Sequence, residues 1–259
     1  MKKLFLTLVL LAPSLLFAQS PFDGTWMVKL DTAQFPTKPD KFTLNKGMYD
    51  CLTCVPAVSI KADGTDQKVM GHPDYDTLAA RVVNANEVEI ISKKAGKTVS
   101  TGTETVSTDG NILTEKFTNT SEDKPVTGEM TYKRVEPGPA GSHAVSGAWR
   151  IEKVSNVSSN GLTSTYKVTA DGMKWSDNNG ESYEGKFDGK DYPIQGDLAH
   201  TMVSLKRISD DTIEETDKQN GKIIAVSRMT VSKDGKTIHV EYNDKLHGTI
   251  TTFIMEKQS

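Results

Sequence analysis

The chain has 259 residues, of which 36% are hydrophobic and 25% charged, and its formal net charge is −3. This is the composition of an ordinary globular protein with one or two domains. It has no basic block of the kind that binds nucleic acid, and no apolar run long enough to span a bilayer. We therefore expect neither a nucleic acid partner nor an integral membrane protein.

The first 18 residues predict a cleaved export signal. Lys2 and Lys3 precede an almost wholly apolar run from Leu4 to Leu16, and Ala18 fits the last position before cleavage. No cysteine lies at the cleavage point, so we expect no lipid anchor. The mature chain is expected in the periplasm or outside the cell, where disulfides form.

The mature chain reads as short strands joined by tight turns. Asp-Gly recurs at 63–64, 109–110, 171–172, 188–189 and 234–235, and Asn-Gly at 160–161, 179–180 and 220–221. These dipeptides favour two-residue hairpin turns. Residues 237–242 alternate between apolar and polar side chains, which is typical of a strand with one buried face. No segment has a helical period over three turns.

An internal repeat of about 125 residues divides this chain. Gly24-Thr25-Trp26 is matched by Gly147-Ala148-Trp149, and Arg134 near the end of the first copy is matched by Lys257 in the second. Asp63-Gly64 matches Asp188-Gly189 in the same way. A period of this length indicates a duplicated domain rather than a solenoid. We expect one domain over 19–135, a Pro- and Gly-rich linker over 136–146, and a second domain over 147–259.

The fold class that these patterns favour is all-β, with two tandem antiparallel up-and-down β-barrels. Full closure removes exposed sheet edges. Two β-sandwiches are the alternative.

Gly-x-Trp on a first strand, with a basic residue on the last, resembles the lipocalin and fatty-acid-binding superfamily. More closely, the chain resembles tandem lipocalin-like exported bacterial proteins of unassigned function. The resemblance implies that each tryptophan closes one end of a barrel beneath a basic side chain. It would pair Trp26 with Arg134, and Trp149 with Lys257.

The chain has two cysteines, Cys51 and Cys54. In an exported protein this pair favours a structural disulfide. A redox centre would need cations or a helix N-terminus to lower the thiol pKa, and the flanking residues read as strand or loop. A zinc site would need two further ligands. We expect no metal and no cofactor.

Two polar loops are candidates for a site. The first contains His72, Asp74, Tyr75 and Asp76, and the second contains His200. A histidine beside carboxylates can bind a metal or act as an acid–base pair, but the sequence favours solvated loops. Glu214, Glu215 and Asp217 are likewise interpreted as an outer, solvated sheet face. We assign no catalytic residue.

The function that the resemblance implies is binding of a small, partly apolar ligand in one or both barrels. An eight-stranded barrel can hold one such ligand or be filled by its own side chains. The alternative is a structural or interaction module of the cell envelope with filled barrels. An enzyme is the third and least favoured hypothesis.

Overall fold

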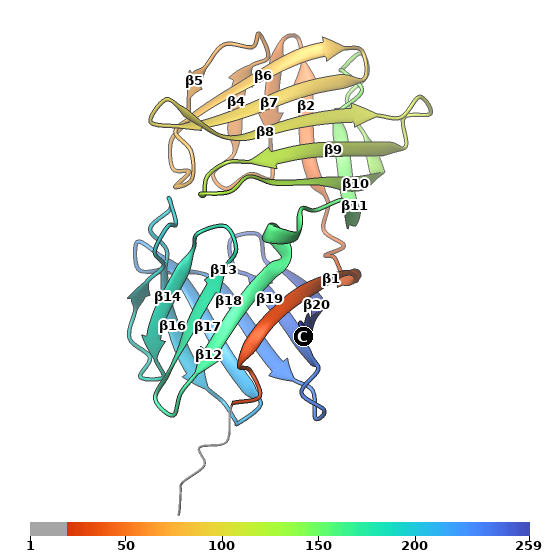
Figure 1. Ribbon diagram of the computed structural model, residues 1–259. Coiled ribbons are helices and arrows are strands. Elements are labelled where there is room, and N and C mark those ends of the chain that lie inside the picture. Colours follow the sequence, from red (N-terminus) through yellow and green to blue (C-terminus); the bar gives the residue numbers. More distant parts are fainter. Residues whose placement is uncertain (1–19) are drawn as a thin grey trace, which may run out of the picture.

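The computed structural model describes residues 20–259, which form two ten-stranded antiparallel sheets with no α-helix. Each sheet curls into a nearly closed barrel (Figure 1). Isolated bridges lie near the open seams, between Ser182 and Gln195 in one barrel and between Asp63 and Arg81 in the other. The expected all-β class with two tandem barrels is confirmed. The expected export signal over 1–18 lies outside the described residues.

We call the two units the inserted barrel and the split barrel. The inserted barrel consists of β2 (Asp40–Asn45), β3 (Met48–Cys51), β4 (Val58–Lys61), β5 (Gln67–Lys68), β6 (Thr77–Asn84), β7 (Glu87–Lys94), β8 (Lys97–Val106), β9 (Ile112–Asn119), β10 (Val126–Pro137) and β11 (Gly147–Ser155). The split barrel consists of β1 (Gly24–Gln34), β12 (Thr163–Val168), β13 (Gly172–Asp177), β14 (Ser182–Lys186), β15 (Tyr192–Pro193), β16 (Met202–Arg207), β17 (Thr212–Gln219), β18 (Lys222–Val231), β19 (Thr237–Asp244) and β20 (Thr249–Lys257).

The first strand of each sequence copy lies in the barrel built by the other copy. β1 lies between β12 and β20, and β11 lies between β10 and β2. The chain therefore begins in the split barrel, crosses to build the whole inserted barrel over 40–155, and crosses back. The barrels do not coincide with the expected domains at 19–135 and 147–259. The two connections between them are residues 35–39 and 156–162, the second including a 3-10 turn, η1 (Ser159–Leu162).

The segment 136–146 is not a linker between the barrels. It closes the hairpin between β10 and β11 within the inserted barrel. Val145 is fully buried there, and the backbone N–H of Leu44 donates to the Ser146 hydroxyl at 2.8 Å. Proline and glycine mark tight turns in general, so composition alone does not separate a packed hairpin loop from a connection between domains.

Each barrel contains a fully buried tryptophan near the start of the strand that comes from the other copy. The indole N–H of Trp26 donates to the Phe22 carbonyl, and that of Trp149 to the Val145 carbonyl, both at 2.8 Å. The basic partners are the reverse of those expected. Lys257 Nζ lies 5.1 Å from the Trp26 ring, and the Arg134 guanidinium carbon lies 3.9 Å from the Trp149 ring.

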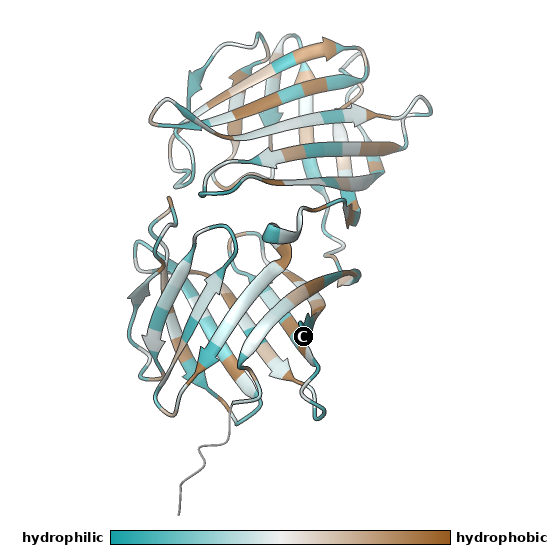
Figure 2. Ribbon diagram, in the orientation of Figure 1, coloured by the Kyte–Doolittle hydropathy of each residue, from teal (hydrophilic) through white to brown (hydrophobic). Residues whose placement is uncertain are grey.

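The exchange of basic partners follows from the strand order. Trp26 on β1 is directly opposite Lys257 on β20, and Trp149 on β11 is opposite Arg134 on β10. Figure 2 shows hydrophobic and hydrophilic residues mixed along the strands. The buried apolar residues form one core cluster in each barrel. Between residues 20 and 259, no helix has the length and apolar character needed to cross a bilayer.

Candidate functional site

The two barrels lie one above the other in Figure 1, and residues of both meet at a junction. Hydrogen bonds hold this junction: the Asp123 N–H donates to the Asn179 carbonyl at 3.0 Å, and the Asn160 amide donates to the Pro125 carbonyl at 3.0 Å. On the other side of the junction, Lys38 Nζ donates to the backbone carbonyl of His247, which follows β19 of the split barrel, at 2.6 Å. Hydrogen bonds therefore join the two barrels on both sides of this junction.

One cavity at this junction, of about 390 Å³, is lined by both barrels. Tyr75, Val99 and Leu198 contribute apolar surface, and Ser100 and Asn119 contribute polar groups from the mouth of the inserted barrel. Its volume is within the range of small-molecule sites. The remaining lining residues are Asp74, Ser92, Ser121, Glu122, Glu181 and Asp197.

Three carboxylates from the two barrels converge at this cavity. Ligand oxygens of Glu122, Asp177 and Glu181 lie within 4.8 Å of one another. Partial burial, with Glu181 and Asp177 nearby, raises the pKa of Glu122 to about 8, and burial together with Asp197 raises the pKa of Glu181 to about 7. These three residues have the spacing to hold a metal ion, with the oxygen donors that Ca²⁺ prefers. At neutral pH the protons of Glu122 and Glu181 compete with any cation.

The structure brings the two polar loops of the sequence to the same junction. Asp74 and Tyr75 from one loop, and Asp197 from the loop that contains His200, line the cavity together. His72 instead stacks on Tyr75, with ring centroids 4.6 Å apart.

The other two residues of these loops serve the local backbone or solvent. Asp76 accepts hydrogen bonds from the Ala95 N–H and the Thr77 hydroxyl, which shapes its turn. His200 is exposed in a left-handed conformation. Neither residue lines the cavity.

A layer of carboxyl and phenol groups lies deeper in the inserted barrel. Glu104 is 6% exposed, and its Oε2 has no hydrogen-bond partner. Burial, reinforced by Glu115, raises the pKa of Glu104 to about 8, against a hydrogen bond from Tyr49. Glu115 accepts a hydrogen bond from the Tyr132 hydroxyl at 3.2 Å. Glu104 alternates along β8 with the buried Gly102 and Val106. This alternation is the sequence signal that could have placed Glu104 inside the barrel.

The split barrel contains a corresponding layer, which corrects the interpretation of Glu215 and Asp217 as outer, solvated residues. Tyr183 donates to Glu215 at 2.5 Å, and Asp217 Oδ1 is buried without a partner. Burial together with Asp217 raises the pKa of Glu215 to about 8. These residues share a strand face with the buried Ile213, whereas Glu214 lies on the opposite face and pairs with Arg228.

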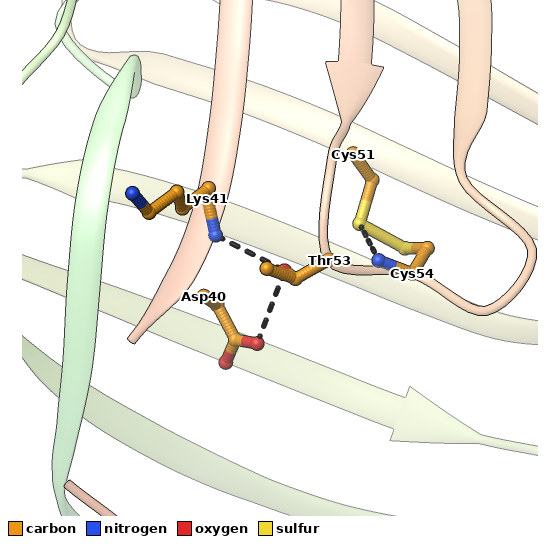
Figure 3. The surroundings of a disulfide bond; sticks show 5 residues. All are labelled: Asp40, Lys41, Cys51, Thr53 and Cys54. Atoms are coloured by element: carbon orange, nitrogen blue, oxygen red, sulfur yellow. Dashed lines mark hydrogen bonds between the residues drawn. A yellow bond between two sulfur atoms is a disulfide. The ribbon is translucent and has the colours of Figure 1, made fainter. Parts of the chain in front are cut away.

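The expected disulfide between Cys51 and Cys54 is confirmed, with Cα atoms 5.5 Å apart. Figure 3 shows it beside Thr53, whose hydroxyl accepts from the Lys41 N–H at 3.0 Å and donates to Asp40. Cys51 is buried in the barrel core. Cys54 lines a second hollow of the junction, of about 510 Å³, with His247 on the facing barrel.

Sequence reasoning found the disulfide, both tryptophans and the two polar loops, and it missed the inward-facing acids. Comparison with known proteins finds no family model that matches this chain and no similar curated protein.

Proposed function

We propose that this chain is an exported binding protein that holds a small, partly apolar molecule at the facing mouths of its two barrels. The observation that carries this proposal is the cavity of about 390 Å³ lined by both barrels. A ligand would enter from the junction, where residues of both barrels line this cavity.

The resemblance to lipocalin-like proteins and the nearly closed barrels support a carrier role. The Cys51–Cys54 disulfide supports export, since disulfides persist in oxidising compartments. The lining combines Tyr75, Val99 and Leu198 with hydroxyl, amide and carboxyl groups. Such a surface suits a molecule with an apolar body and a polar group.

Native mass spectrometry of the exported protein tests the proposal. We expect a reproducible bound small molecule that is released on mild denaturation. Ser100→Trp should displace it, because Ser100 lines the cavity. Thr101→Trp is the matched control, since its side chain points to the opposite face of β8. An unliganded mass for the wild-type protein, with no shift after incubation with amphiphiles and hydrophobic dyes, would overturn the carrier proposal.

The second candidate is an interaction module, which one surface feature favours. Leu52, Val55 and Leu246 are exposed and line the larger hollow beside the disulfide. Neighbouring apolar side chains that remain exposed are typical of protein interaction surfaces. Leu52→Ser with Leu246→Ser should abolish partner binding in this case while leaving small-molecule binding unchanged.

A further inference from the structure

We propose that the ligand carries a hydrogen-bond-donating cation, an alkylammonium group, which binds between Glu104 and Glu115 inside the inserted barrel. This inference rests on the proposed function and names the chemical class of its ligand. The ammonium would donate a hydrogen bond to Glu104 Oε2, which has no partner in the free protein. The apolar part of the ligand would extend toward the junction.

The first support is the unmet hydrogen-bonding capacity of Glu104. The residue is 6% exposed, and its Oε2 is buried without a partner. A buried polar atom without a partner destabilises the free protein, and more so when the group is charged. An ammonium group offers three hydrogen-bond donors, one of which can reach this oxygen, and a positive charge that balances the carboxylate.

The second support is the arrangement of groups around this atom. Glu104 and Glu115 are directly opposite each other on β8 and β9. The hydroxyl of Tyr132 donates to Glu115, and burial together with the neighbouring Glu104 raises the pKa of Tyr49. The layer therefore combines two carboxyl groups with two phenol groups. The electrostatic influences on the layer come from acidic groups and phenols, including Asp40 and Tyr75.

The third support is that this layer and the lining of the junction cavity lie on the same strand faces of β8 and β9. Ser100 and Asn119 line the junction cavity, and they share inward faces with Glu104 and Glu115 on the same two strands. Gly102 lies between Ser100 and Glu104 and is without a side chain. A Cβ atom at that glycine would lie 3.2 Å from Glu115 Oε1, so this carboxylate lies over Gly102.

The fourth support is that the split barrel places the same chemistry on other strands. Its layer contains Glu215 and Asp217 on β17 with Tyr183 on β14. In the repeat, the positions that correspond to Glu104 and Glu115 are occupied by Met229 and Val240. The two acidic layers therefore occupy positions that are not equivalent in the repeat.

Isothermal titration calorimetry with three probes of one chain length tests the inference: hexylammonium, hexanol and hexanoate. We expect hexylammonium to bind at least tenfold more tightly than either of the others. Glu104→Gln should weaken hexylammonium at least tenfold and leave hexanol unchanged. Glu152→Gln is the matched control, because this exposed glutamate lies on the outer side of β11 beside Arg150.

The pH dependence gives a second measurement that needs no variant. Because burial and Glu115 raise the pKa of Glu104 to about 8, the free protein carries a proton there at pH 6–7. Binding of a cation requires its release. Hexylammonium affinity should rise about tenfold per pH unit between pH 6 and 8, with proton release visible as a dependence of the heat on buffer.

The outcomes separate the two proposals. Equal binding of all three probes, unaffected by Glu104→Gln, would overturn the ammonium site and leave the carrier role standing. Loss of hexylammonium binding in Glu122→Gln but not in Glu104→Gln would also overturn it, since the cation would then bind at the junction. Failure of every probe, together with an unliganded native mass, would overturn both proposals.

Discussion

The basic residues over the two tryptophans occupy equivalent positions in the repeat, but the structure predicts very different contributions to stability. Arg134 donates to the backbone carbonyls of Gly110, Ser146 and Ala144, the last two at 2.6 and 2.7 Å. Its guanidinium also lies over the Trp149 ring. Lys257 is exposed, and within residues 20–259 its ammonium forms no hydrogen bond and only the contact with the indole of Trp26. We compare Arg134→Met with Lys257→Met.

The magnitudes follow from these contacts. A hydrogen bond to a charged group contributes about 1.5–3 kcal/mol, and three of them set an upper limit that partial rehydration of the carbonyls reduces. With a cation–π contact of about 1 kcal/mol, Arg134→Met should cost about 3–5 kcal/mol. Lys257→Met loses an exposed cation–π contact and should cost about 0.5–1 kcal/mol.

Urea unfolding followed by hydrogen exchange of each barrel's peptides measures these costs separately. Arg134→Met should destabilise the inserted barrel alone, and Arg134→Lys should fall between it and the wild type. Equal costs for Arg134→Met and Lys257→Met, within about 1 kcal/mol, would refute the reasoning that the three carbonyl contacts decide the difference.

Three further predictions follow from the strand order, the buried acids and the disulfide. Residues 40–155 expressed alone should give the circular dichroism and sharp amide spectrum of a folded barrel, whereas residues 19–135 should not, because they lack β11. The pKa of Glu104 and Glu215 is raised to about 8 by burial, above the value of about 4.3 in an unfolded chain, so their stabilising contribution is complete below pH 4 and declines as the pH rises to 8. Unfolding free energies at pH 5.5 should exceed those at pH 8.5 by at least about 2 kcal/mol, and Glu104→Gln with Glu215→Gln should flatten this dependence. Replacing Cys51 and Cys54 with serine should cost about 2 kcal/mol, seen as a lower melting temperature of the inserted barrel alone.

The sequence predicted the strands and the barrels but not the assignment of strands to barrels. Turn dipeptides and the repeat define where strands begin and end, because those signals are local. The pairing of β1 is not local: Trp26 meets a basic side chain whether it lies beside Arg134 or beside Lys257. Both arrangements satisfy the same residues, so only the path of the connections at 35–39 and 156–162 decides between them.

The inward-facing acids were missed for a different reason. Glu214 and Glu215 are adjacent, so a strand must place one of them on each face. We interpreted both as solvated because carboxylates are rarely buried without a partner. The buried Ile213 two residues before Glu215 was the signal that pointed inward. Rules based on typical burial fail where a protein places unpartnered polar groups inside, as binding sites do.

The position of β1 and β11 also bears on the origin of the duplicated chain. Each copy gives its first strand to the other and receives the equivalent strand in return. Between separate molecules, such reciprocal exchange of an identical element is domain swapping. A single-repeat ancestor that swapped its first strand would have been an obligate homodimer. Fusion of two such protomers through the 138–146 loop would give this fold directly, with no new strand pairing.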